Sequence, residues 1–305
     1  MSNEEVALEL INMDTLDKKQ RSRLRKVLMR IGENGLQVNN MEKATFIFGK
    51  AFSSCLNAPQ GPESKLKLIY FVANLLLSCH LISNSRQLGM NMLKVIQSRS
   101  LPPIENYRKQ DQLLYNYYSG IYYTSDDQLE KAYKHLKTAF NLVNTSHPIA
   151  LKILHKLLPL CLLKGEVPSK SLLLKCEPLQ LYSLAIQSLK SGNLKNFQNF
   201  LAINQQFLIH QETLFLFEKM QYAVLRCLLK KSYSFIHVNE QVPIPLFKSI
   251  LLFSTQQDID TIQYYNWVSN LIERGYIRCN IYLEEDLIAF DPSNPFPSLK
   301  SIPFH

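Results

Sequence analysis

Helical apolar patterns follow one another along most of this chain, separated by short links that are rich in helix breakers. Links such as Asn57–Pro62 and Leu101–Pro103 span only a few residues. Because links this short join antiparallel neighbouring helices, the pattern indicates a stack of helices. With only 9 glycines in 305 residues and 46% hydrophobic residues, the sequence predicts a folded, mostly α-helical protein.

The predicted helices fall into two runs. The first run consists of Glu4–Met13, a basic stretch at Lys18–Arg30, Met41–Leu56, Ser64–Leu81 and Ser85–Gln97. The second run consists of Pro148–Lys164, Leu179–Ser191, Leu194–Ile209 and Thr213–Lys231. Gly165 is expected to end the first helix of the second run. The most apolar stretch, Leu68–Ile82, is shorter than the roughly 20 residues of a membrane span, so a buried core helix is expected there.

Between these runs lies a stretch with the spacing of a tetratricopeptide helix pair. Small and large residues stand at the repeat offsets 0, 3, 12, 16 and 19 and are Gly120, Tyr123, Ala132, Leu136 and Ala139. The small residues let two helices cross closely, and the large ones fill the groove between them. The pair Asp126-Asp127 is expected to cap the second helix.

After Val242 the segments become shorter. Three short helices are predicted, followed by Gly275 and two alternating runs; the segments are Pro245–Phe253, Asp258–Tyr264, Tyr265–Arg274, Tyr276–Leu283 and Asp286–Phe290. Gly275 is expected to end the third helix in a left-handed conformation, and Tyr276 to pack. Three helices followed by a two-stranded hairpin is the order of a winged-helix domain, whose third helix takes the place of a recognition helix.

The net charge of +9 is unevenly placed. Residues 1–149 and 150–241 each carry a net charge of +6, whereas residues 242–305 carry −3. A positive helical body suits contact with nucleic acid or with an acidic protein, and the charge does not choose between them. The six cysteines stand singly and the N-terminus is acidic, which together favour reduced thiols in the cytosol or nucleus.

At the C-terminal end the residues resemble a known family. Leu271–Arg278, followed by Ile281 and Asn294–Pro297, resembles the end of the PCI domain found in subunits of the proteasome lid, the signalosome and translation initiation factor three. Further stretches resemble the branch that pairs with a GANP-type scaffold in the TREX-two mRNA-export complex; they are Tyr118–Phe140, Leu163–Pro168, Gly192–Phe197 and Glu218–Tyr233. The close paralogue of this branch is a signalosome-associated, splicing-linked subunit.

The resemblance implies a fold and a function. The fold is a TPR-like helical-repeat stack closed by a C-terminal winged-helix domain, divided into divergent N-terminal repeats (1–114), the helical part (115–241), the winged helix (242–297) and a tail (298–305). The implied function is that of a non-enzymatic subunit that binds a GANP-type scaffold and a small acidic Sem/Dss-type protein. We expect the protein to be located in the nucleus, including at the nuclear pore, with a smaller part of it in the cytoplasm. Two alternatives are a signalosome- or splicing-associated subunit and a winged-helix DNA-binding regulator.

Two sets of cations are candidates for binding RNA or DNA, weakly and in a salt-dependent way. The first set is Arg226, Lys230, Lys231, Lys248, Arg274 and Arg278. Of these, Arg226 and Lys230 are spaced to share one helix face, which is either a solvated face or a positive ledge. The second set is a basic N-terminal patch of Lys18, Lys19, Arg21, Arg23, Arg25 and Lys26, which could bind phosphates or act as a nuclear-import signal.

Signatures of catalysis and metal binding are missing from the sequence. It contains no P-loop, dinucleotide-binding, nucleophile-elbow or HExxH motif. Its seven histidines include no i, i+4 pair, and no Cys/His pair has zinc-finger spacing. We therefore expect no enzyme activity, small-molecule substrate, cofactor, metal or membrane span.

Overall fold

The computed structural model describes residues 2–304, apart from 38–40, 145, 237–239 and 257–259. The described chain is mostly helical, with one small antiparallel sheet, as predicted. It divides into two compact units, unit 1 (Met1–Ile153) and unit 2 (Leu154–His305). The predicted domain boundaries at residues 114, 241 and 297 were drawn from sequence patterns, whereas the two units are defined by compactness. The predicted boundaries therefore stay a prediction.

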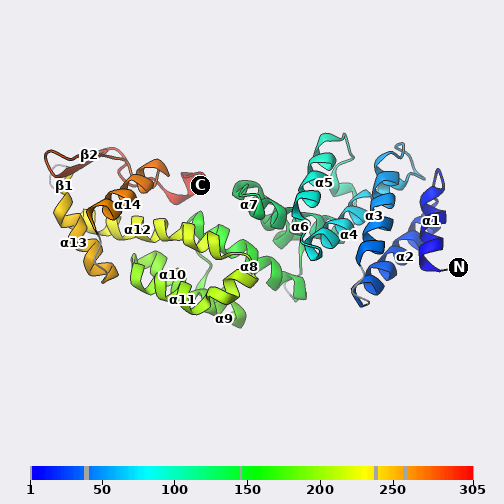
Figure 1. The fold of residues 1–305 in the computed structure, drawn as a ribbon, viewed down its shortest axis with the longest axis horizontal. Coiled ribbons are helices and arrows are strands. Elements are labelled where there is room, and N and C mark those ends of the chain that lie inside the picture. The colour runs from blue at the N-terminus through cyan, green and yellow to red at the C-terminus, as the bar shows by residue number, and fades with distance from the viewer. Residues whose placement is uncertain (1, 38–40, 145, 237–239, 257–259, 305) are drawn as a thin grey trace. The chain divides into compact units, whose positions relative to one another are not determined.

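Unit 1 is a succession of helices in which neighbours in sequence pack on each other (Figure 1). Its elements are α1 (Asn3–Asn12), α2 (Lys18–Gln37), α3 (Met41–Leu56), the 3-10 turn η1 (Lys65–Leu68), α4 (Ile69–Ile82), α5 (Arg86–Ser98), η2 (Ile104–Asn106), α6 (Lys109–Ser125) and α7 (Leu129–Leu142). The next helix, α8 (Pro148–Leu163), begins in unit 1 and ends in unit 2. The long predicted helices of this region are all present.

The apolar helix α4 forms the centre of unit 1. Within the described residues, one helical stretch, Lys65–Ile82, is long and apolar enough to cross a membrane by composition, but 72% of it is buried inside the protein. Ile69, Val72 and Leu77 are fully buried, and α4 contacts α3, α5 and α6. The burial fits the core helix that the sequence predicts.

Helices α6 and α7 form the predicted helix pair. A Cβ atom added to Gly120 would lie 2.4 Å from Leu136 Cγ, so only glycine permits this close crossing. The prediction for the cap was wrong. The N-cap residue of α7 is Gln128, without a side-chain cap, and Asp127 takes a positive φ of 56° in the turn instead.

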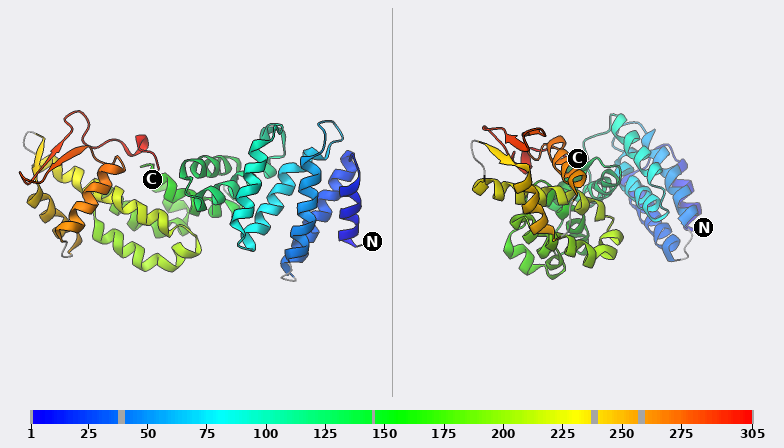
Figure 2. Two further views of the ribbon diagram at one scale, coloured as in Figure 1. Left: turned by 45° about the horizontal axis from the view of Figure 1, so that its top comes forward. Right: turned by 60° about the vertical axis from the view of Figure 1, so that its left-hand side comes forward.

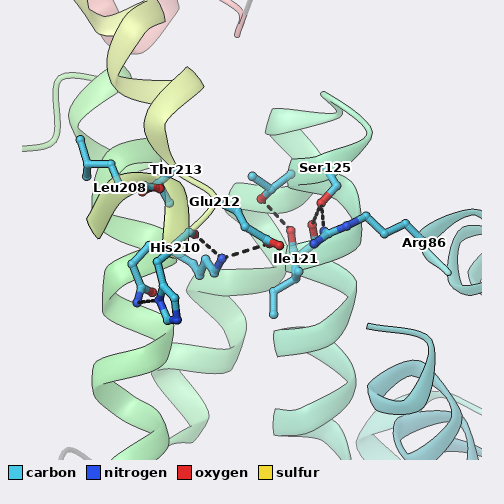
Figure 3. A network of polar contacts seen from close by, with 11 residues as sticks. Arg86, Ile121, Ser125, Leu208, His210, Glu212 and Thr213 are labelled. Atoms are coloured by element: carbon cyan, nitrogen blue, oxygen red, sulfur yellow. Dashed lines mark hydrogen bonds and ion pairs between the residues drawn. The ribbon is translucent and has the colours of Figure 1, made fainter. Parts of the chain in front are cut away.

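Polar contacts tie helix ends together within each unit, and Figure 3 shows some of them. In unit 1, Arg86 at the start of α5 donates to Ser125 Oγ on α6, which in turn donates to the Ile121 carbonyl at 3.2 Å. In unit 2, Lys156 on α8 lies 3.4 Å from the Glu212 carboxylate. The Arg86–Ser125 and Lys156–Glu212 contacts join segments that are well separated in sequence, whereas the Ser125–Ile121 bond joins successive turns of α6.

Unit 2 begins as a helical layer and ends in a smaller mixed segment. Its helical elements are the end of α8, α9 (Lys170–Lys175), η3 (Glu177–Tyr182), α10 (Ser183–Ser191), α11 (Leu194–His210) and α12 (Leu214–Ile236). Their core is aromatic: Tyr182 stacks on Phe217 with ring centroids 5.7 Å apart, and Phe200 packs on Phe217 at 5.2 Å. Gly165 and Gly192 end helices with positive φ, which agrees with the predicted breaks.

In its described residues, the C-terminal segment contains three strands and two α-helices. They are β1 (Gln241–Pro243), α13 (Ile244–Thr255), α14 (Thr261–Glu273), β2 (Cys279–Tyr282) and β3 (Leu287–Phe290), followed by η4 (Leu299–Ser301). The antiparallel sheet has the order β1-β3-β2 and lies beside α13, as both views of Figure 2 show. In register, Val242 and Ile281 both pair with Ile288.

Two predictions for this segment need correction. The expected helices Asp258–Tyr264 and Tyr265–Arg274 form one helix, α14, although Asp258 itself lies outside the described residues. Asp260 caps this helix by accepting a hydrogen bond from the Gln263 amide at 2.6 Å, so the helix starts there and nothing interrupts it at Tyr265. Strand β1 was not predicted. Gly275 has the predicted positive φ, and Tyr276 is buried.

Candidate nucleic-acid interface

Arg226 lies on the buried face of α12, where it holds the C-terminal segment. Its side chain is 7% exposed, and Nε donates to the Tyr276 carbonyl while Nη2 donates to the Phe296 carbonyl, both at 3.2 Å, and also to the Pro297 carbonyl. Burial lowers the pKa of this guanidinium, since leaving water disfavours its charge. Arg226 therefore has a structural role in the described fold and contributes no exposed charge.

Lys230 and Lys231, one turn further along α12, are exposed. Lys231 Nζ donates to the Ser191 carbonyl at 3.2 Å, at the C-terminal end of α10, where a cation also suits the helix dipole. Within the described part of the chain, Lys230 makes no hydrogen bond or ion pair. The C-terminal segment thus covers Arg226 but not Lys230, and the two do not form the joint ledge that their i, i+4 spacing predicts.

Arg274 follows the last residue of α14 and packs on α12. Its guanidinium carbon lies 4.6 Å from the centre of the Tyr222 ring, a cation–π contact. Close by, the lining of a cavity of about 420 Å³ includes the aromatic rings of Tyr222, Trp267 and Phe215 together with one cation, Lys219, and one carboxylate, Glu218. Stacking surfaces beside positive charge are what single-stranded nucleic acid needs, because each base offers a π-face and each phosphate a negative charge.

Arg278 and Lys248 lie elsewhere in the C-terminal segment. Arg278 Nη1 is 3.9 Å from the Asp291 carboxylate, and its side chain is 56% exposed. Hydrogen bonds from Ser293 lower the pKa of Asp291, and the charge of Arg278 adds to this. Lys248 on α13 donates to the Thr261 hydroxyl at 3.1 Å. The phosphate sites expected around Arg278 are thus partly offset by a carboxylate.

The aromatic cavity beside Arg274 is the feature that sequence reasoning missed. Trp267 is half-buried and lines this cavity together with Tyr222. The sequence positions of Tyr222 and Trp267 do not predict this cavity. The two residues belong to different helices, α12 and α14, which come together only in the folded protein. The described structure thus brings Arg274 onto the Tyr222 ring, which lines the cavity together with Trp267, and no motif connects these residues.

The basic N-terminal patch, which lies in unit 1, is divided by the fold. Lys18, Lys19, Arg23 and Lys26 on α2 are exposed. Arg21 donates from Nη1 to the Leu16 carbonyl. Arg25 forms a two-pronged pair with Asp111 on α6, with Nη1–Oδ1 and Nη2–Oδ2 distances of 2.9 and 2.5 Å, and its guanidinium carbon lies 4.0 Å from the centre of the Phe71 ring.

Side chains that could bind a metal ion do not gather in the described residues. There, no group of three or more His, Cys, Asp or Glu side chains is arranged to hold a metal ion. The six cysteines are free thiols, and burial raises the pKa of Cys55 to about 12. Burial also lowers the pKa values of His80, His135 and His155, which keeps these rings neutral.

Comparison with known proteins gives a consistent set of relatives. No protein-family model matches the chain. It is 32% identical over 271 residues to the "PCI domain-containing protein 2 homolog" of Dictyostelium discoideum, covering 87% of this chain and 62% of that protein.

Two further relatives carry related names. The chain is 27% identical over 282 residues to the "Protein CSN12 homolog" of Mycosarcoma maydis, covering 86% of this chain and 61% of the relative. It is 26% identical over 265 residues to "PCI domain-containing protein 2" of Xenopus laevis, covering 86% and 65%. The chain thus spans a little over 60% of the length of these curated relatives.

Proposed function

We propose that this chain is a PCI-family assembly subunit that acts by binding rather than by catalysis. The observation that carries the proposal is the 32% identity, over 87% of the chain, to a protein named for its PCI domain. The mostly helical fold agrees with such a role. The similarity to proteins named Protein CSN12 homolog supports the same family.

The chain order of the C-terminal segment supports a winged helix. The end of α12 is followed by β1, α13, α14, β2 and β3, and the sheet has the order β1-β3-β2. A helix, a short strand, two helices and a two-stranded wing is the arrangement of a winged-helix domain, in which α14 takes the position of the recognition helix. The pair α6–α7, with Leu136 against Gly120, supports the TPR-like interpretation of the stack.

Within that family, we favour the subunit of a TREX-two-like mRNA-export complex in the nucleus. Its partners would be a GANP-type scaffold and a small acidic Sem/Dss-type protein, and it would add a basic surface for RNA or DNA. The relatives named PCI domain-containing protein 2 and the net charge of +9 support this assignment. We assign nucleic-acid binding to the aromatic cavity beside Arg274 and to the exposed Lys230.

A second candidate is a signalosome- or splicing-associated subunit of the same fold. The specific observation in its favour is the similarity to proteins named Protein CSN12 homolog. A winged-helix DNA-binding regulator has less support, because Arg274 packs on Tyr222 and the Asp291 carboxylate offsets part of the charge of the exposed Arg278.

Affinity purification of the tagged chain from its own cells, followed by mass spectrometry, tests the proposal. Recovery of a GANP-type scaffold together with a small acidic protein supports the mRNA-export assignment. Recovery of signalosome or splicing proteins in their place supports the second candidate. A preparation in which the chain brings down no other PCI-type or scaffold protein contradicts an assembly role of either kind.

A further inference from the structure

A basic pocket of about 560 Å³ lies in unit 1. We call it the α2–α6 pocket; its charged lining consists of Lys18, Arg21, Arg25, Lys67, Arg108 and Asp111. Lys18 is the first residue of α2, and Arg108 directly precedes α6, so the ends of two helices meet at the pocket. None of the nucleic-acid candidates of unit 2 takes part in it.

The charge of the pocket is strongly positive. Five cations and one carboxylate line it, and the two-pronged pair between Arg25 and Asp111 leaves that carboxylate fully engaged. Arg21 donates to the Leu16 carbonyl, and Lys67 donates to the Pro62 carbonyl. These hydrogen bonds orient the two side chains but do not neutralise their charges. Four positive charges therefore stay available to an anion at one pocket. Because Lys18, Lys67 and Arg108 are exposed, their attraction for an anion is strongest at low salt.

Part of the pocket wall is apolar. Leu66 and Leu68 are 5% and 4% exposed, and Pro102 and Tyr107 complete this wall. The Tyr107 hydroxyl donates to the Leu66 carbonyl at 3.3 Å, and its ring packs edge-on against Tyr70 with centroids 4.7 Å apart. Burial raises the pKa of Tyr107 to about 12, so this wall carries no charge of its own. A ligand with a charged end and an apolar body matches such a site.

The walls are fixed by a buried lysine next to the pocket. Lys65 is 6% exposed, and its Nζ donates to the Ile11 carbonyl at 2.9 Å, to the Met13 carbonyl and to the Ser54 hydroxyl. The Leu16 amide also donates to the Glu63 carbonyl at 2.9 Å. These bonds join η1 to the α1–α2 connection and to α3, so the pocket is preformed and a ligand need not order it.

We propose that the α2–α6 pocket binds a small organic molecule that carries two or more phosphate groups. The phosphates lie against Lys18, Arg21, Lys67 and Arg108, and the organic part lies against Tyr107, Leu66 and Pro102. The volume is in the range of small-molecule sites, roughly 300–1,000 Å³, and arginine forks match phosphate oxygens in pairs. A concave pocket with one apolar wall suits this ligand better than a nucleic-acid strand, which needs a continuous track.

Isothermal titration of the full 305-residue chain at low salt tests the proposal, with ATP, inorganic tripolyphosphate and hexaglutamate as probes. We expect ATP to bind most tightly, because it alone offers both phosphates and an organic body. The double variant Lys18→Gln/Arg108→Gln should weaken ATP binding on the order of tenfold or more, since two charged contacts are lost. The matched control Lys94→Gln/Arg99→Gln removes the same charge from exposed positions at the end of α5, outside the pocket, and should leave ATP binding within about twofold.

Several outcomes would overturn the proposal. Equal losses in the two double variants would mean that net charge alone attracts the probe. Tripolyphosphate binding as tightly as ATP would remove the role of the apolar wall, and tighter binding of hexaglutamate would identify an acidic peptide site. Absence of ATP binding to a wild-type chain with an intact helical spectrum would also refute it. None of these results bears on the assembly role or on nucleic-acid binding by unit 2.

Discussion

Arg226 on α12 donates a hydrogen bond from Nε to the backbone carbonyl of Tyr276, 3.2 Å away, in the segment that follows α14. Two more bonds from Nη2 reach the carbonyls of Phe296 and Pro297. One guanidinium therefore joins the last long helix to the segment that precedes β2 and to the segment that follows β3. Tyr233 extends the same joint, with its ring 4.7 Å from Phe290 and 5.5 Å from Phe296.

Replacing Arg226 should reduce stability. Arg226→Met keeps the length of the side chain but leaves three buried carbonyls without their donor, and we expect a loss of about 2–4 kcal/mol in the free energy of unfolding. Arg226→Lys should fall between Met and wild type, because one ammonium cannot reproduce the planar fork. Urea denaturation followed by circular dichroism measures both, and a loss below about 0.5 kcal/mol for Arg226→Met would contradict this role.

The close crossing of α6 and α7 predicts opposite effects of adding a methyl group to two glycines. Gly120→Ala places a Cβ 2.4 Å from Leu136 Cγ and should destabilise the chain by about 1–3 kcal/mol. Gly49→Ala is the control, since no atom lies within 4 Å of its new Cβ in the middle of α3. That change should stabilise by about 0.5–1 kcal/mol. Thermal melting of both variants gives the signs, and a stabilising Gly120→Ala would refute the crossing.

The sequence predicted the helices well because their evidence is local. Apolar periodicity, breaker-rich links and terminal glycines all act within a few residues, and the bounds of α3, α8 and α11 agree with their predictions within one residue. Strand β1 could not be found this way. Its three residues include Pro243 and are too few for an alternating pattern to be recognised in the sequence, and it is a strand because it pairs with β3.

The candidate site shows the same limit. Helical spacing places Arg226 and Lys230 on one face, but it cannot show that Phe296 and Pro297 cover one turn and leave the next exposed. In unit 1 the basic cluster of α2 is evident in the sequence, whereas Lys67 and Arg108, which complete the pocket, come from separate segments. Which cations act together is decided by long-range packing, and one sequence alone carries no record of it.

A buried histidine predicts how stability depends on pH. His155 is 8% exposed, and its Nδ1 lies 2.9 Å from the Tyr182 hydroxyl. Burial lowers its pKa, and the charge of Lys156 lowers it further. The folded state therefore binds a proton less readily than the unfolded state, whose histidine titrates near 6.5. The stabilisation is complete above that pH and is lost as the pH falls through 6.5 toward the lower folded value.

The free energy of unfolding should accordingly fall between about pH 7 and pH 5, and His155→Gln should flatten part of this decrease. Tyr182→Phe is the control, because it removes the hydroxyl and keeps the titrating ring, so its pH dependence should persist. Urea denaturation at a series of pH values measures the slope. A His155→Gln variant with the wild-type slope would assign the effect to other groups, such as the buried His80 or His135.

RNA binding by unit 2 should depend on the aromatic cavity and on the exposed cations in different ways. Trp267→Ala removes a stacking surface, and we expect a loss of about 1–3 kcal/mol in the binding of single-stranded RNA with little change in its salt dependence. Lys230→Gln removes a charge without an aromatic surface, so it should weaken binding mainly at low salt. It should also reduce the slope of log affinity against log salt concentration by about 0.7.

Lys300→Gln is the control for this prediction. It makes the same charge change in the exposed turn η4, at a position not assigned to nucleic acid, and should leave that slope unchanged. Fluorescence anisotropy with labelled oligonucleotides over a range of salt concentrations separates these effects, and identical salt slopes for all three variants and the wild type would remove Lys230 from the interface.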